Sequence, residues 1–115
     1  MSEQSLSKMT LEEIVRQANS AGMAYVSAKK IAERLELMKP IVRARVMERH
    51  DDGERSETKI RRLAETDPEY IRFIEELADA RAEAEKTRIR YESYKNLFEA
   101  RRSMLSYQKA EMRLT

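Results

Sequence analysis

The second half of this chain carries an uninterrupted seven-residue repeat of apolar side chains, and this repeat narrows the possible folds more than any other feature. After Pro68 the sequence contains no glycine or proline up to residue 115. The members of the repeat are Tyr70, Leu77, Ala84, Tyr91, Phe98, Leu105 and Met112. A row sustained at this spacing is typical of the seam of a coiled coil. We therefore expect one long helix over residues 67–113.

A companion row on the same predicted helix begins apolar and ends polar. Its members are Phe73, Ala80, Thr87, Tyr94, Arg101 and Gln108. Because a seam needs both of its rows to be apolar in order to pack tightly, this change indicates that packing loosens towards the C-terminus.

The first half carries a similar apolar stripe. Thr10 and Glu13 have the spacing of a capping box, in which two side chains satisfy backbone donors at the start of a helix. The stripe then recurs at spacings of three and four, with Lys39 as the one polar member: Leu11, Ile14, Ala18, Ala21, Tyr25, Ala28, Ala32, Leu35, Lys39, Val42 and Val46. This predicts a helix over residues 10–49. Pro40 is expected to kink that helix or to split it, because proline removes a hydrogen bond and clashes with the preceding turn.

A joint is expected between the two helices, over residues 50–66. Asp51-Asp52-Gly53 favours a break, and Ser56 to Glu65 has the pattern of a short helix. The sequence therefore predicts an all-α fold: an antiparallel, coiled-coil-like hairpin forming one domain over residues 10–115, after a flexible segment 1–9. Because a two-helix hairpin buries only one side of each helix, we also expect it to assemble into an oligomeric bundle.

The charge of the chain is arranged in blocks. Residues 29–62 carry eleven basic and seven acidic side chains, residues 63–85 carry two and eight, and residues 86–115 carry eight and three. A hairpin that bends near residues 50–66 places the first block against the second. We expect that pairing to neutralise most of a basic cluster on the first helix, made of Lys29, Lys30, Arg34, Arg43 and Arg45. The net +5 of the last block is left without an acidic counterpart.

Several classes of function are disfavoured by composition. The chain has no cysteine, which excludes disulfides and thiol chemistry. His50 is the only histidine, it has no partners at metal-ligand spacing, and we expect it at a solvated helix end. No phosphate-binding loop or catalytic motif occurs. We therefore expect no enzyme activity, cofactor or metal, and, without an apolar run of about 20 residues or a signal peptide, a cytoplasmic protein that does not bind membranes.

One set of basic residues is a candidate for binding nucleic acid. Arg81, Arg88, Lys95, Arg102 and Lys109, here called the basic row, recur every seven residues, and Tyr94 and Tyr107 are interleaved with them. Cations that follow a phosphate backbone, with aromatic rings on which bases stack, are typical of proteins that bind single-stranded DNA. The alternative is that the long stems of these side chains cover the seam while their charges remain solvated.

The overall layout resembles small helical-hairpin proteins of tailed phages and prophages. The resemblance spans roughly residues 23–113 and rests on residues 24–32, on residues 57–67 and on residues 109–113. Members of that class often lie near recombination genes, and the layout is also similar to that of phage recombination mediators.

The resemblance implies an accessory protein of DNA recombination or replication that acts in the host cytoplasm. Its implied partners are further copies of the same chain, single-stranded DNA, and recombination or replication proteins. The alternative function is a coiled-coil interaction or assembly module that binds no nucleic acid. A third is an inhibitor of a host nuclease or regulator.

Overall fold

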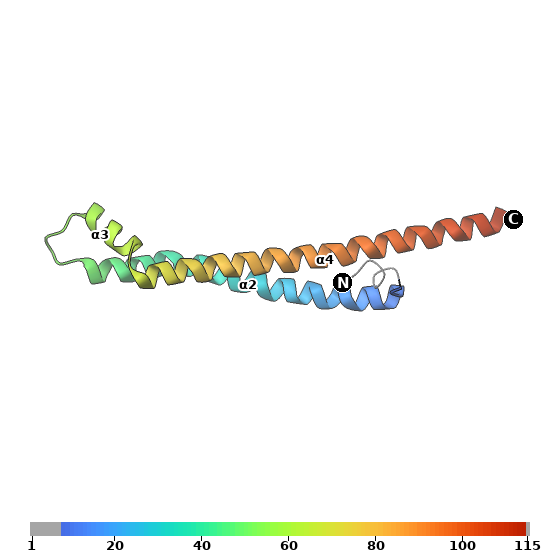
Figure 1. The fold of residues 1–115 in the computed structure, drawn as a ribbon, viewed down its shortest axis with the longest axis horizontal. Coiled ribbons are helices and arrows are strands. Elements are labelled where there is room, and N and C mark those ends of the chain that lie inside the picture. Colours follow the sequence, from blue (N-terminus) through green and yellow to red (C-terminus); the bar gives the residue numbers. More distant parts are fainter. Residues whose placement is uncertain (1–7, 115) are drawn as a thin grey trace. The chain divides into compact units, whose positions relative to one another are not determined.

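The structure, a computed structural model, describes residues 8–114. It contains three helices: α2 (Leu11–His50), α3 (Glu57–Glu65) and α4 (Pro68–Leu114). No strand occurs among the described residues. The predicted all-α helical hairpin is therefore confirmed (Figure 1). Most of the segment expected to be flexible, residues 1–7, lies outside the described residues.

The start of α2 follows the sequence closely. The backbone N–H of Thr10 donates to the Glu13 carboxylate at 3.1 Å, and the Glu13 N–H donates to the Thr10 hydroxyl at 3.1 Å. This is the predicted capping box. The helix then continues to His50 as one element with Pro40 inside it. Pro40 therefore does not split α2 into two pieces.

The turn after α2 is built from its own polar side chains. Gly53 adopts a φ of 82°, in the left-handed region that favours glycine. One Asp52 carboxylate oxygen accepts the N–H groups of Glu54 and Arg55, both at 2.9 Å. These hydrogen bonds favour the charged carboxylate, and they hold the pKa of Asp52 below its ordinary value of 3.8.

The next two helices begin at side-chain caps. The Ser56 hydroxyl accepts the N–H of Lys59 at the start of α3, at 3.2 Å. Asp67 accepts the N–H of Glu69 at 2.9 Å, directly before Pro68 opens α4. Proline is favoured at this first position because its fixed φ suits a helix and its missing donor would have had no partner.

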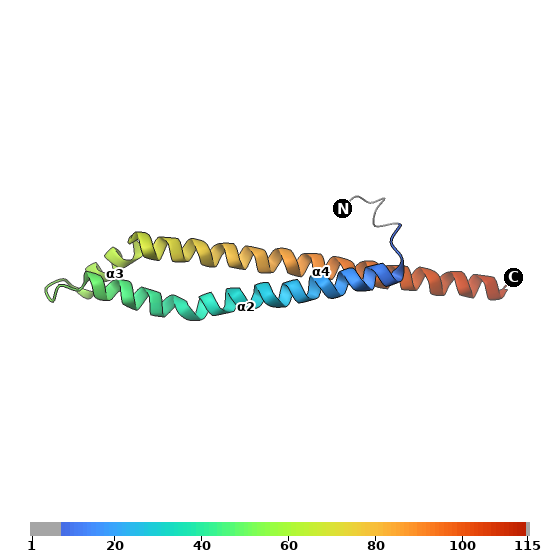
Figure 2. The same ribbon diagram turned by 90° about the horizontal axis from the view of Figure 1, so that it is seen from below.

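The chain forms two compact units, and both long helices contribute to each. One unit combines the chain up to Val26 with the chain from Glu85 onward, and the other is Ser27–Ala84. Within each unit a stretch of α2 lies beside an antiparallel stretch of α4 (Figure 2). We call them the terminal unit and the joint unit.

The joint unit contains the larger core. Its central buried cluster comprises Val42, Val46, Ala64, Tyr70, Phe73 and Leu77. Leu35, Met47 and Ile74 pack against this cluster. The short helix α3 thus contributes Ala64 to the same core as the two long helices. Burial of the valine, leucine and phenylalanine side chains of this cluster stabilises the fold by roughly 1.5–3 kcal/mol each.

The terminal unit is packed more sparsely. Its buried residues are Ile14, Ala21, Thr87 and Tyr94. Gly22 lies so close to α4 that an added Cβ would be 3.1 Å from the Tyr91 ring. A small residue at position 22 therefore allows the Tyr91 ring to pack directly on the α2 backbone.

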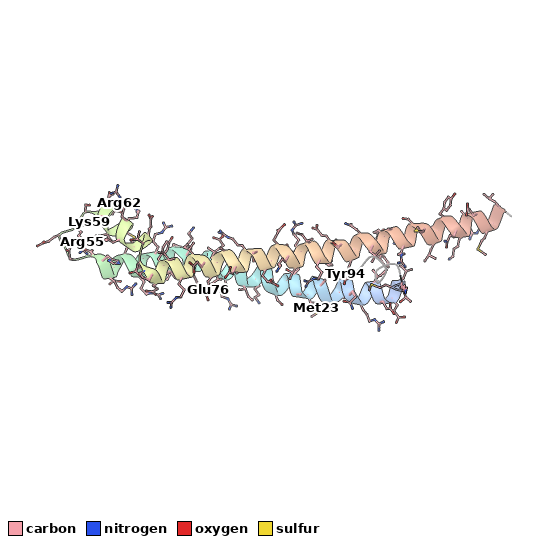
Figure 3. All side chains as sticks on the ribbon, viewed as in Figure 1. Met23, Arg55, Lys59, Arg62, Glu76 and Tyr94 are labelled. Atoms are coloured by element: carbon pink, nitrogen blue, oxygen red, sulfur yellow. The ribbon has the colours of Figure 1, made fainter. Side chains whose placement is uncertain are left out.

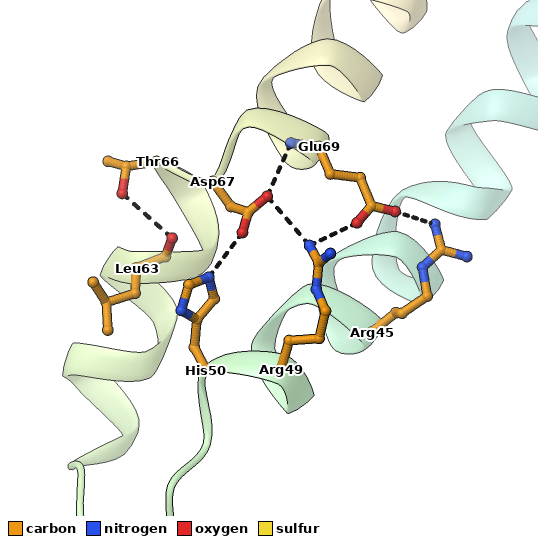
Figure 4. Close-up of polar contacts among 7 residues, drawn as sticks. All are labelled: Arg45, Arg49, His50, Leu63, Thr66, Asp67 and Glu69. Carbon is orange, nitrogen blue, oxygen red and sulfur yellow. Dashed lines mark hydrogen bonds and ion pairs between the residues drawn. The ribbon is translucent and has the colours of Figure 1, made fainter.

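Ion pairs near the joint follow the predicted alignment of the charge blocks. Arg45 binds Glu69 at 2.8 Å, and Arg49 binds Glu69 at 2.6 Å and Asp67 at 3.2 Å (Figure 4). Further along the joint unit, Glu36 pairs with Arg81. Exposed pairs of this kind contribute only about 0–1 kcal/mol each, so they favour this register while apolar burial supplies most of the stability.

Candidate functional site

The basic row divides into two parts in the structure. Arg81 pairs with Glu36 across the hairpin of the joint unit. Arg88 binds two carboxylates of its own helix, Glu85 and Glu92, the second at 2.9 Å. These contacts raise the pKa of Arg88 and lower that of Glu85. Two of the five cations are therefore already neutralised by protein carboxylates.

The remaining three cations of the basic row face solvent. The Nζ of Lys95 lies 5.0 Å from the centroid of the Tyr91 ring, a cation–π contact that leaves its charge uncompensated. Arg102 and Lys109 are exposed. None of these three makes an ion pair with another residue of the range 8–114.

The two tyrosines predicted to stack with bases differ in accessibility. Tyr94 is only 8% exposed, so its ring packs within the terminal unit and is not available to a nucleotide. Tyr107 is 66% exposed. The expectation for Tyr94 therefore needs correction: it belongs to the companion row of the seam, and α2 covers that side of α4.

The predicted seam is likewise covered over only part of its length. Tyr70 and Leu77 are buried, and Tyr91 and Phe98 are half-buried. Leu105 is 46% exposed and Met112 76% exposed. These last two positions keep the spacing of the seam, but their side chains are much more exposed than those of Tyr70 and Leu77.

Arg101 is the last residue of α4 that is partly buried. Its guanidinium donates to the carbonyl oxygen of Met9 at 2.8 Å, directly before the capping box of α2. All described residues after it, 102–114, are exposed. We call this range the C-terminal segment, and Figure 1 shows it as the last part of α4, beyond the start of α2.

The C-terminal segment carries more apolar surface than the seam repeat predicts. Met104, Tyr107 and Leu114 are also exposed, and they follow one another at spacings of three and seven. Positions at these spacings lie on one side of a helix. With Leu105 and Met112 they form a broad, mainly apolar face, in which Gln108 and Glu111 are the polar members. The seam repeat does not include this second row, although the spacing of its members is present in the sequence.

His50 differs from its expected role as a solvated helix end. Its Nε2 lies 2.9 Å from Asp67, so it connects the end of α2 with the start of α4 (Figure 4). The hydrogen bond from His50, with that from the Glu69 N–H, lowers the pKa of Asp67. This histidine therefore helps to close the hairpin.

The rest of the described surface shows no constellation suited to metal binding. Within residues 8–114, no group of three histidine, cysteine or acidic side chains is placed to hold a metal ion. In the same range, no helix has an apolar stretch long enough to cross a membrane. A groove between the helices of the terminal unit is lined by residues that include Val15, Tyr91 and Phe98.

Comparisons with known protein families, with curated proteins and with solved structures find no match to this chain. The resemblance to phage helical-hairpin proteins therefore stays a prediction.

Proposed function

We propose that this protein is a non-enzymatic interaction module that binds a helix of another protein through its C-terminal segment. The observation that carries the proposal is the apolar face of residues 102–114, where Met104, Leu105 and Tyr107 are 59%, 46% and 66% exposed. Exposed apolar surface of this extent on a helix favours a partner. A second helix lying along this face would occupy the place that α2 occupies further back along α4.

The charge of the C-terminal segment defines the chemistry of its partner. Arg102, Lys109 and Arg113 against Glu111 give the segment a net charge of +2. Basic residues that flank an apolar face favour acidic residues at the rim of the partner. The proposed partner is therefore an amphipathic helix with an apolar stripe and acidic flanks.

Capture of partners from cells that naturally make this protein tests the proposal. The test variant carries Leu105→Glu and Met112→Glu. Its control carries Asn96→Glu and Ser106→Glu, with the same added charge at exposed positions of α4 that lie neither three nor four residues from a member of the apolar face. We expect the wild type and the control to retain the same protein and the test variant to lose it. Capture of nothing, or equal capture by all three, would contradict the proposal.

A second candidate function, binding of single-stranded DNA, is favoured by a different observation. Lys95, Arg102 and Lys109 share one side of α4, face solvent and have no ion pair within residues 8–114. The exposed ring of Tyr107 lies between the last two in sequence. A role as an accessory of phage recombination or replication belongs to this second candidate and rests on the resemblance in sequence layout.

The salt dependence of oligonucleotide binding tests this second candidate. Three phosphate contacts give a log–log slope of about −2 for a single strand, which is roughly a 20-fold loss of affinity between about 50 and 200 mM salt. Replacing Arg102 and Lys109 by glutamate should reduce that loss to about threefold or abolish binding. The matched control replaces Lys59 and Arg62, which project from α3 in Figure 3, by glutamate. No binding at the lower salt concentration, or equal effects of the two variants, would exclude this function.

A further inference from the structure

A second apolar row on α2 lies outside the core of the joint unit. Ile31, Met38 and Ile41 are exposed, the first by 54% of its surface. Arg34 falls in the same row, so that the spacings are three, four and three along the helix. Residues at these spacings form a continuous stripe on one helical face. This stripe is separate from the seam residues of α2, which point towards α4.

An ion pair between α2 and α4 fixes which side of the hairpin carries the stripe. Arg45 binds Glu69 of α4 at 2.8 Å. Met38 is one heptad before Arg45, and Glu76 is one heptad after Glu69. Because the two helices are antiparallel, Met38 and Glu76 occupy neighbouring positions on the same flank as the Arg45–Glu69 pair. The Glu36–Arg81 pair lies on the other flank of the hairpin.

This flank has two columns of unlike character, which together we call the paired-column face. The column on α2 is apolar and basic: Ile31, Arg34, Met38, Ile41 and Arg45. The column on α4 is mainly acidic: Glu69, Arg72, Glu76, Asp79 and Glu83. Their net charges are +2 and −3. Within residues 8–114, Arg34, Glu76 and Asp79 make no ion pair, and Figure 3 shows Glu76 projecting from the helix.

We propose that the paired-column face binds the same face of a second copy of this chain, about a two-fold axis parallel to the hairpin. That axis places the α2 column of one copy against the α4 column of the other, and equivalent residues of the two copies have the same position along the axis. Ile31 and Met38 of the two copies meet near the axis, and Arg34 of each lies opposite Asp79 of the other. Ile41 packs on the stem of Arg72, whose charge remains solvated. The contact is closed and self-complementary.

The charges decide between this arrangement and its alternative. A two-fold axis perpendicular to the helices would place the two α2 columns against each other and the two acidic columns against each other. Like charges juxtaposed at an interface disfavour association. The parallel axis instead brings opposite charges together twice, and it buries the apolar stripe that α4 of the same chain leaves uncovered.

Light scattering after size-exclusion chromatography tests the interface on the full chain. Ile31→Glu should convert the dimer into a monomer with unchanged helicity. Val26→Glu is the control, because Val26 is 64% exposed on the same helix and no member of the stripe lies three or four residues from it. A wild type that is monomeric at all concentrations, or an equal effect of the two variants, would overturn the proposal.

A charge exchange tests the predicted pairing itself. Arg34→Glu or Asp79→Arg alone should raise the dimer dissociation constant about tenfold, because each change creates two like-charge contacts per dimer. The double variant, or an equimolar mixture of the two single variants, should restore association to within about threefold of the wild type. Failure of both to restore it would overturn the pairing. The Leu105→Glu, Met112→Glu variant should remain dimeric, which separates this interface from the C-terminal segment.

Discussion

Replacing Pro40 by alanine tests the energetic cost of a proline inside α2. The helix continues through this position to His50, so the carbonyl oxygen of Glu36 lacks the backbone donor that an ordinary residue would supply. Pro40 is exposed, so the substitution removes little packing. We therefore expect Pro40→Ala to raise the free energy of unfolding.

The structure bounds the size of this gain. Restoring one backbone hydrogen bond contributes about 1 kcal/mol. Removing the ring clash as well approaches the full difference between proline and alanine in a helix interior, about 3 kcal/mol. For a chain of 115 residues, each kcal/mol corresponds to roughly 4 °C in Tm. The expected increase is therefore about 4–12 °C.

Urea denaturation followed by circular dichroism measures the effect at a fixed protein concentration, so that association does not alter the comparison. Leu37→Ala is the control, since it changes another exposed position of α2 without restoring a donor, and it should shift stability by less than about 0.5 kcal/mol. A Pro40→Ala protein that is no more stable than the wild type would refute the reasoning. That result would mean that Pro40 makes a stabilising contribution to the folded protein that offsets the cost of proline inside a helix.

Three further predictions concern the core and the joint. Leu77→Ala should lower the free energy of unfolding by about 3 kcal/mol, because Leu77 is almost fully buried in the main core; a loss below about 1 kcal/mol in urea would argue against that packing. Gly53→Ala should cost about 1 kcal/mol by the same measurement, since nothing crowds the new Cβ and only the positive φ opposes it; no loss would show that the turn can rearrange. Asp67 has a lowered pKa in the folded state, so its contribution is present above the ordinary value of 3.8 and is lost as pH falls through the folded value. Asp67→Asn should therefore be less stable than the wild type at neutral pH, with a difference that shrinks in acid; a difference that is constant with pH would contradict the role of its charge.

The local structure of this protein follows directly from its sequence. The capping box at Thr10 and the cap at Ser56 were predictable because each depends on residues three positions apart. The start of α4 at Pro68 was predictable as well, because proline is favoured at the first position of a helix and Asp67 directly before it can cap the backbone. The seven-residue repeat likewise indicated which rows of α4 would pack against another helix.

The candidate site was less predictable, because the neutralisation of a basic side chain and the exposure of an aromatic ring depend on more than one row of residues. Arg88 was expected to be available to a phosphate, yet Glu85 and Glu92 on its own helix bind it. Their spacing of three and four was present in the sequence, but the seven-residue row alone did not include them. Tyr94 is a member of the companion row of the seam, so the repeat itself predicted its burial, and this conflicted with its place among the residues expected to bind nucleic acid.

The sequence by itself determined the helices, their caps and the antiparallel alignment of their charge blocks, because these depend on neighbours along the chain or on a simple repeat. Only the tertiary structure decided which members of each repeat are covered. Leu77 and Leu105 have the same place in the seam, yet one is buried and the other is half exposed. The physical reason is that burial requires a second surface, and the described part of α2 begins too late in the chain to cover the end of α4.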